Sequence, residues 1–250
     1  MKLDRMIAVR TNKTVWRDGD MCLKVFDRTY SRAGVLSEAL NLARVAEIGV
    51  RVPELREVRP IDGCFTIITD YIPGKTLDRL MREDPGQRAR YMELFVKTQL
   101  SVQEKTCPPL VKLRDRIRRK LPLTDLEATL RYDLISRLEA MPQTERLCHG
   151  DFEPENLILG EDGEIWILDW SRASQGNPEA DAAKTWLRFM INGDPAGADD
   201  YVRVWSGMTG KSADAVHEWI PIIAAAEAMD GYMSERAFCH EIARNYRFSK

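Results

Sequence analysis

The character of the sequence changes at residues 72–74 (Ile-Pro-Gly), and this change restricts the fold more than any other feature. Before it, β-rich runs flank Asp18-Gly19 and Asp62-Gly63, which predict hairpins because both central positions of a type I′ turn need a positive φ. After it, long stretches repeat apolar residues at helical spacing. Strands and helices are therefore segregated, which argues against a doubly wound sheet or a TIM barrel, where they would alternate.

Helical and hairpin patterns extend this division along the chain. Residues 31–48 predict one helix within the β-rich part, since they lack proline and stop at Gly49. A third Asp-Gly pair, Asp162-Gly163, predicts a short hairpin between residues 156 and 168. Further helical patterns cover residues 85–107, 110–120, 124–139, 178–191, 195–205 and 212–247. We expect an α+β protein with a β-rich lobe at residues 1–72 and a mostly helical lobe at residues 73–250.

Composition excludes several functional classes. The 37 Lys and Arg against 39 Asp and Glu give a net charge of −2, so no global basic field indicates a nucleic-acid or anionic-membrane partner. With 44% hydrophobic and 30% charged residues, the chain can bury a core and does not have the composition of a disordered protein.

The sequence also favours a cytoplasmic location. Residues 1–13 contain no apolar run long enough for a signal peptide, and the most apolar stretch, residues 220–226, is too short to cross a bilayer. The five cysteines are odd in number and form no CxxC pair, which indicates neither a disulfide framework nor a cysteine zinc site. We therefore expect a reducing cytoplasm and no membrane association.

Polar residues flank the hairpin expected between residues 156 and 168. Asp151 and Asn156 precede it and Asp169 follows it, so the hairpin can bring these side chains to one edge of a cleft. Carboxylate and amide oxygens suit Mg²⁺, which shares its coordination shell with substrate phosphates. A carboxylate that does not bind the metal can accept a proton from a substrate hydroxyl.

Three motifs resemble a known superfamily. Residues 147–159 (LCHGDFEPENLIL) resemble the catalytic loop, residues 167–170 (ILDW) the metal-binding loop and residues 176–186 (GNPEADAAKTW) the following segment of aminoglycoside phosphotransferases and choline kinases, which are relatives of protein kinases. The resemblance spans nearly the whole chain and implies a bilobal, protein-kinase-like fold. It also implies transfer of the γ-phosphoryl group of ATP, or of GTP, to a hydroxyl of a small, aminoglycoside-like or amino-alcohol acceptor.

The resemblance further implies roles for individual residues in the C-terminal lobe. Asp151 would be the catalytic base, and Asn156 and Asp169 the Mg²⁺ ligands. His149 and Asp181 would organise the catalytic loop structurally.

In the N-terminal lobe the resemblance implies a nucleotide site. Lys24, in the strand motif CLKVF, would contact the phosphates with Glu38 as its ion-pair partner. The backbone from Asp70 to Ile72 would hydrogen-bond the adenine, which Val15 would cover.

The chain departs from the family pattern at the nucleotide-covering hairpin, because residues 9–16 contain no glycine that would let amides approach phosphates closely. That role would fall to amides and side chains of residues 11–14, among them Asn12.

A second departure is Glu153, where the family usually has histidine. We expect Glu153 either to be exposed on its loop or to face an aminated acceptor, which Glu227, Asp230 and Glu235 could also line.

Two alternatives remain open at this point. One is a protein or glycan kinase on the same fold, although no long activation-loop-like segment separates Asp169 from Gly176. The other is a noncatalytic nucleotide-binding module, which the presence of Lys24, Asp151 and Asn156 together with Asp169 disfavours.

Overall fold

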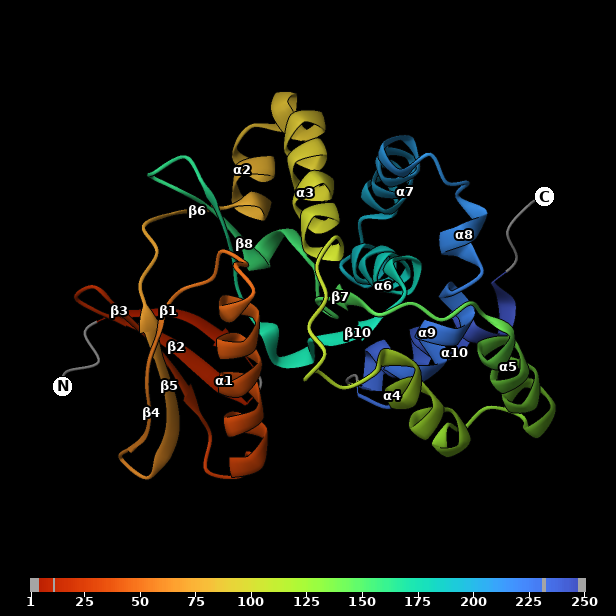
Figure 1. Cartoon of the computed structure of the whole chain (residues 1–250), viewed down its shortest axis with the longest axis horizontal. Coiled ribbons are helices and arrows are strands. Elements are labelled where there is room, and N and C mark those ends of the chain that lie inside the picture. The colour runs from red at the N-terminus through yellow and green to blue at the C-terminus, as the bar shows by residue number, and fades with distance from the viewer. Residues whose placement is uncertain (1–4, 11, 231–232, 247–250) are drawn as a thin grey trace. The chain divides into compact units, whose positions relative to one another are not determined.

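The computed structural model describes residues 5–10, 12–230 and 233–246. The chain divides into two compact units (Figure 1). The first unit comprises Met1–Glu83 and Pro154–Arg172, and the second comprises Asp84–Glu153 and Ala173–Lys250. The first unit therefore takes one short segment from late in the sequence. The functional assignment of residues 1–72 to nucleotide covering and of residues 73–250 to catalysis remains a prediction.

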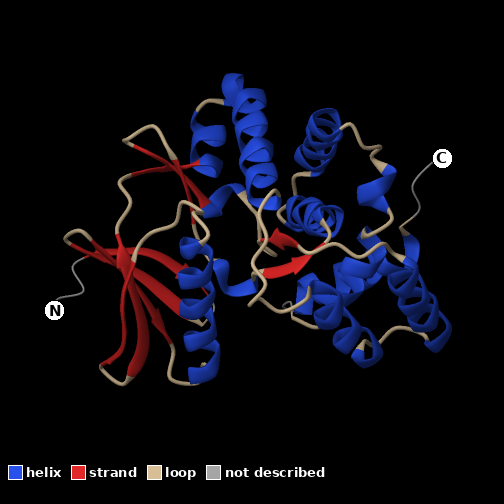
Figure 2. Ribbon diagram, viewed as in Figure 1, coloured by secondary structure: helices blue, strands red, loops and turns tan. Residues whose placement is uncertain are grey.

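A five-stranded antiparallel sheet is the larger of the two sheets in the first unit (Figure 2). Its spatial order is β1-β2-β3-β5-β4, where the strands are β1 (Arg5–Arg10), β2 (Lys13–Asp18), β3 (Met21–Phe26), β4 (Leu55–Ile61) and β5 (Cys64–Asp70). The hairpins predicted at the first two Asp-Gly pairs are confirmed, and their turn glycines Gly19 and Gly63 have φ of 64° and 79°.

One helix, α1 (Arg32–Glu47), packs on this sheet, as the sequence predicts. The Ser31 side chain caps the helix by accepting a hydrogen bond from the amide of Gly34. A small core of Phe26, Val35, Ala39 and Ile67 joins helix to sheet. Because this apolar face of α1 is held against the sheet, polar residues on the same side of the helix can reach the strands.

The remaining elements of the first unit include a second, three-stranded sheet of order β6-β8-β9. They are β6 (Gly74–Thr76), α2 (Leu77–Glu83), β8 (Leu157–Gly160), β9 (Ile165–Ile167) and the 3₁₀ helices η3 (Pro154–Asn156) and η4 (Trp170–Arg172). The predicted hairpin at Asp162-Gly163 is thus confirmed as β8 and β9, and its strand β8 also pairs with β6.

The close approach of β6 to β8 requires Gly74. A Cβ atom there would lie 2.3 Å from the carbonyl oxygen of Leu159 and 2.9 Å from the Cα of Gly160. We expect Gly74→Ala to lower the free energy of unfolding by more than about 1 kcal/mol, because the backbone must move apart. Urea unfolding checks this against Gly207→Ala, where an added Cβ meets nothing within 4 Å. Equal midpoints for the two variants would contradict the prediction.

The second unit is mostly helical, with one short sheet of β7 (Arg146–Cys148) and β10 (Ser174–Gly176). Its helices are η1 (Pro85–Gln87), α3 (Arg88–Gln103), α4 (Leu113–Lys120), η2 (Leu121–Leu123), α5 (Ala128–Ala140), α6 (Pro178–Ile191), α7 (Pro195–Thr209), α8 (Asp214–His217), α9 (Ile220–Glu227) and α10 (Met233–Asn245). Rings of Phe95, Phe152 and Tyr201 form the centre of its core. Among the described residues, the helical pattern over residues 212–247 is divided into α8, α9 and α10, and Pro221 lies in the first turn of α9.

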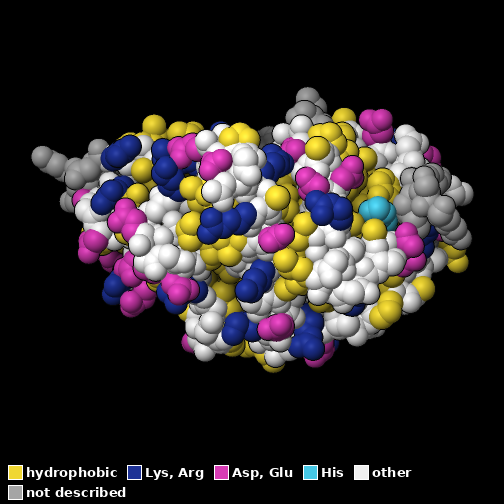
Figure 3. Space-filling view, turned by 90° about the horizontal axis from the view of Figure 1, so that it is seen from above, with side chains coloured by type: hydrophobic (Ala, Val, Ile, Leu, Met, Phe, Trp, Pro, Cys, Tyr) yellow, Lys and Arg dark blue, Asp and Glu magenta, His cyan; other side chains and the backbone are white. Residues whose placement is uncertain are grey.

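The described helices and one face of the surface bear on whether the partner is a membrane or a polyanion. None of the described helices is long and apolar enough to cross a bilayer. On the face shown in Figure 3, acidic, basic and apolar side chains are interspersed. The basic run on α4 is also paired within the unit, since Arg118 contacts Glu139 at 3.2 Å and Arg114 donates to the carbonyl of Leu138 at 2.6 Å.

Candidate active site

Two lysines and two carboxylates meet inside the first unit. Residues 13, 15 and 17 of β2 share one face, and Val15 lies opposite Lys24 of β3 in the sheet register. Lys24 forms a hydrogen-bonded ion pair with the buried Glu38 of α1, and its Nζ lies 3.4 Å from Oδ2 of Asp169. Lys13 donates a hydrogen bond of 3.0 Å to the same oxygen. The β-sheet, α1 and the loop after β9 thus supply one charged cluster.

These contacts hold both Lys24 and Asp169 in their charged forms. Burial by itself would lower the pKa of Lys24, but the carboxylates of Asp169 and Glu38 outweigh it and raise that pKa. Burial would raise the pKa of Asp169, but Lys24 and Lys13 hold it well below its ordinary value. Asp169 is therefore an ionised carboxylate across the physiological pH range.

The backbone after β9 directs Asp169 into the cluster. Asp169 has a φ of 58°, a conformation that aspartate tolerates better than most side chains. The next residue, Trp170, is buried, and its carbonyl accepts a hydrogen bond of 3.3 Å from Asn41 of α1. On the N-terminal side of Asp169, the Leu168 amide donates to the carbonyl of Asn156 at 2.8 Å, so the two ends of the β8–β9 hairpin are held together.

The residues present fit a magnesium ion. Oδ1 of Asp169 is buried and has no hydrogen-bond partner within the described part of the chain. Asn156 lines the same cavity and offers an amide oxygen of the kind Mg²⁺ accepts. Because no group of three or more His, Cys, Asp or Glu among the described residues could enclose a metal, an ion here would complete its shell with water and phosphate oxygens.

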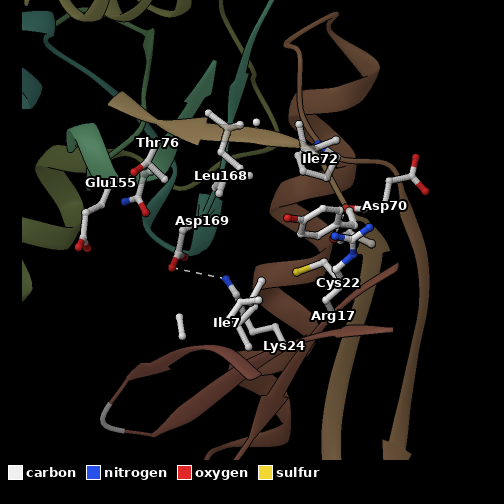
Figure 4. A pocket seen from close by; sticks show the side chains of 18 of the residues that line it. Ile7, Arg17, Cys22, Lys24, Asp70, Ile72, Thr76, Glu155, Leu168 and Asp169 are labelled. Carbon is white, nitrogen blue, oxygen red and sulfur yellow. Dashed lines mark hydrogen bonds and ion pairs between the residues drawn. The ribbon is translucent and has the colours of Figure 1, made fainter. Parts of the chain in front are cut away.

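A cavity of about 760 Å³ within the first unit contains this cluster (Figure 4). In Figure 4 the Asp169 carboxylate points towards the Lys24 ammonium, with Leu168 and Ile72 further along the wall. The predicted site residues that line it are Val15, Lys24, Glu38, Asp70, Ile72, Asn156 and Asp169. Asn12 is not among the lining residues, and its carbonyl accepts the Asp27 amide at 2.9 Å. Thr11 lies outside the described residues.

The segment after β5 forms one side of the cavity. The amides of Asp70 and Tyr71 donate to the carbonyls of Glu54 and Asp20, at 3.1 and 2.8 Å. The Tyr71 ring stacks under the guanidinium of Arg17, 4.1 Å from its centroid. These contacts hold the segment against the sheet.

In the second unit, a hydrogen-bonded network holds the loop that carries Asp151. Asp181 of α6 accepts the Gly150 amide at 2.8 Å, and its other oxygen accepts Gln103 Nε2 at 3.1 Å. His149 is fully buried and accepts the Asp151 amide through Nδ1 at 3.2 Å. The contacts of His149 and Asp181 are thus to the loop backbone and to buried neighbours, and Asp151 itself is half-buried.

Glu153 differs from the sequence-based expectation. It is only 8% exposed, so the exposed-loop interpretation is wrong. Its oxygens accept hydrogen bonds from Arg188 Nε at 2.8 Å and Asn192 Nδ2 at 2.9 Å. The cation that Glu153 faces is therefore supplied by the chain itself. Burial and the neighbouring Asp151 raise the pKa of Glu153, and Arg188 opposes that rise.

The acids proposed to bind an aminated acceptor also have partners within the second unit. Glu227 lies 3.0 Å from the ammonium of Lys184, and Glu235 lies 3.7 Å from Arg188. Asp230 is paired with Lys120.

The sequence matches the profile of the phosphotransferase enzyme family (APH) over residues 7–219, and the chain belongs to that family. No curated protein matches the chain significantly.

Solved structures share the fold at low sequence identity. A choline/ethanolamine kinase family protein from Mesorhizobium loti matches with a TM-score of 0.64 and 20% identity, covering 98% of this chain and 89% of that one. Aminoglycoside phosphotransferase APH(4)-Ia matches with a TM-score of 0.71 and 14% identity, over 95% and 90%. Choline kinase LicA from Streptococcus pneumoniae matches with a TM-score of 0.66 and 14% identity, over 96% and 93%. The expected kinase-like α+β fold is confirmed.

Proposed function

We propose that this protein is an ATP-dependent phosphotransferase that transfers the γ-phosphoryl group to a hydroxyl of a small molecule. The observation that carries the proposal is the Lys24–Glu38 pair beside Asp169 and Asn156 in one cavity. Phosphoryl transfer needs little covalent help from a protein, and depends mainly on neutralising charge and aligning the reacting groups. Membership of the phosphotransferase family supports the same reaction.

The cavity can hold the nucleotide. Val15, Ile158 and Leu168 provide apolar surface for a purine ring. Because the Asp70 and Tyr71 amides already donate within the unit, the Ile72 amide and the Asp70 carbonyl are the groups we assign to the base edge. Variants of aminoglycoside phosphotransferase APH(4)-Ia were solved with ADP or AMP-PNP, which supports a nucleotide in this family's fold. GTP is the alternative donor.

The phosphates belong at the charged end of the cavity. Lys24, held by Glu38, would contact them, and Asn156 and Asp169 would hold Mg²⁺. When bound, Mg²⁺ neutralises charge that develops on the phosphate oxygens. The buried, unpaired Oδ1 of Asp169 supports this assignment.

Asp151 is the group we assign as the base. Its carboxylate would accept the proton of the acceptor hydroxyl as that oxygen attacks phosphorus. The contacts of Asp181 to Gly150 and of His149 to Asp151 hold the backbone of this loop in place.

For the acceptor we propose an aminoglycoside-like compound or an amino alcohol carrying a cationic group. Two of the structural neighbours are a choline kinase and an aminoglycoside phosphotransferase, and the latter was solved with hygromycin B. A protein or glycan kinase, and a noncatalytic nucleotide-binding module, are the alternatives.

For the location we propose the cytoplasm, because the five free thiols suit a reducing compartment.

Nucleotide binding can be tested by thermal unfolding. We expect ATP with Mg²⁺ to raise the Tm of the protein, since ligand at one hundred times its Kd stabilises the folded state by roughly 2.7 kcal/mol. Asp169→Asn should lose the part of the shift that depends on Mg²⁺, because an amide is a weaker ligand than a carboxylate. A shift that is equal with and without Mg²⁺ in both proteins would contradict the metal assignment.

The acceptor class can be tested by coupled detection of ADP. A panel of aminoglycosides, choline, ethanolamine and neutral sugars separates the small-molecule classes, with Asp151→Asn as the background. ADP release with only a peptide or glycan would favour the kinase alternative. Nucleotide binding with no release above background for any compound would favour a noncatalytic module.

A further inference from the structure

The hairpin between β1 and β2 brings a second lysine to the charged cluster. We propose that Lys13 binds the nucleotide phosphates and so takes the place of the backbone amides of a glycine-rich loop. When the nucleotide binds, the Lys13 ammonium breaks its hydrogen bond with Asp169 and contacts the phosphates instead. This inference rests on the proposed function.

Lys13 is partly buried and lines the cavity. Its side chain is 16% exposed, close to the 19% of Lys24. Its ammonium lies 3.0 Å from Oδ2 of Asp169, 4.0 Å from Oε2 of Glu38 and 5.8 Å from the centre of the Phe26 ring. A lysine on a hairpin strand loses side-chain entropy in such a position, so it needs a compensating interaction.

The two lysines differ in how firmly they are held. Lys24 forms a hydrogen-bonded ion pair with Glu38 in addition to its contact with Asp169. The hydrogen bond of Lys13 is to Asp169, the group we assign to Mg²⁺. A metal on Asp169 would compete with that hydrogen bond, which would leave the Lys13 ammonium available to an anion in the same cavity.

The form of the hairpin explains why a lysine is suited to this role. Arg10 pairs with Lys13 across the turn, so the loop between β1 and β2 is short. The Asn12 carbonyl is held by the Asp27 amide, and no glycine is present at residues 9–16 to let the backbone approach a phosphate closely. The flexible stem of a lysine instead carries a full positive charge from the strand to the ligand.

The expected consequence is a selective loss of phosphate affinity. A charge-assisted hydrogen bond contributes enough that its loss should weaken ATP binding by about 10-fold, while adenosine binding is unchanged. Lys13→Met removes the charge and keeps the apolar stem, and Lys13→Arg keeps the charge and should retain most of the ATP affinity.

Titration calorimetry of adenosine, AMP and ATP, each with Mg²⁺, provides the test. Arg28→Met is the control, because Arg28 is an exposed cation of the same unit that donates to the carbonyl of Asp62 and is not among the residues lining the cavity. That variant should leave the ratio of ATP affinity to adenosine affinity as in the parent protein, whereas Lys13→Met should reduce this ratio by about 10-fold.

The outcomes distinguish this proposal from the proposed function. If Lys13→Met binds ATP as tightly as the parent protein, or loses adenosine and ATP affinity equally, Lys13 is not a phosphate-binding residue. If the unaltered protein binds neither adenosine nor ATP, the proposed function itself fails.

Discussion

Replacing Asp151 with asparagine should reduce kcat by roughly 10²–10⁴-fold, the usual contribution of a general base. Asparagine preserves the shape of the side chain but cannot accept the proton of the acceptor hydroxyl. Nucleotide affinity should not change, because the nucleotide cavity is lined by residues of the first unit and Asp151 is not among them. Coupled ADP release gives kcat, and titration calorimetry gives the nucleotide Kd.

Glu161→Gln is the control for this measurement, since Glu161 is an exposed acid in the β8–β9 turn. It should leave kcat unchanged. An Asp151→Asn protein with full activity would mean that another group accepts the proton, and equal losses in the two variants would indicate a general effect of charge.

Replacing Arg188 with methionine should destabilise the second unit by roughly 3–5 kcal/mol, as expected when one partner of a buried ion pair is removed. The side chain of Arg188 is 24% exposed and that of Glu153 is 10% exposed, so solvent screens their interaction only weakly. Without Arg188, Glu153 is a buried carboxylate near Asp151 that keeps the hydrogen bond donated by the Asn192 amide. Urea unfolding measures the loss.

The loss should depend on pH in a defined direction. The pKa of Glu153 is raised in the folded protein, so its stabilising contribution is present at low pH and is lost as the pH rises through the folded pKa. Removing Arg188 removes an effect that lowers this pKa. The deficit of Arg188→Met should therefore be larger at pH 8 than at an acidic pH at which the carboxyl group of Glu153 has taken up a proton.

A double variant provides the control. Arg188→Met combined with Glu153→Gln has no buried carboxylate at this position and keeps a group that can accept the Asn192 amide. It should recover much of the lost stability and most of the pH dependence should disappear. Equal deficits at both pH values, with no recovery in the double variant, would show that the arginine contributes through packing alone.

Local sequence signals predicted much of the secondary structure. The Asp-Gly pairs at residues 18–19, 62–63 and 162–163 all lie in hairpin turns, and each glycine has a positive φ. Both residues of the pair have a positive φ only at Asp62-Gly63, so the expected type I′ conformation is not formed at the other two pairs. The helix at residues 31–48 was predicted to within one residue at each end, at Arg32–Glu47. Residues 212–247 were less well predicted, since apolar periodicity does not show where one buried helix ends and another begins.

Motif spacing likewise placed several side chains that the structure brings together. Lys24 and Glu38 form an ion pair, and Asn156 and Asp169 line one cavity from the two ends of a hairpin. Their assigned roles remain predictions. Lys13 was missed, although strand alternation puts it on the same face as Val15 and could have indicated it.

Local signals in the sequence indicated most of the strands and helices and the positions of the chemical groups along them. Those features depend on turn conformation and periodicity, which act over a few residues. Only the tertiary structure decided which charges meet: Lys13 reaches Asp169 across 156 residues, and Arg188 meets Glu153 across 35. The position of a charged residue in the sequence does not identify its partner, because burial and long-range packing determine whether the side chain faces solvent, a ligand or an opposite charge of the same chain.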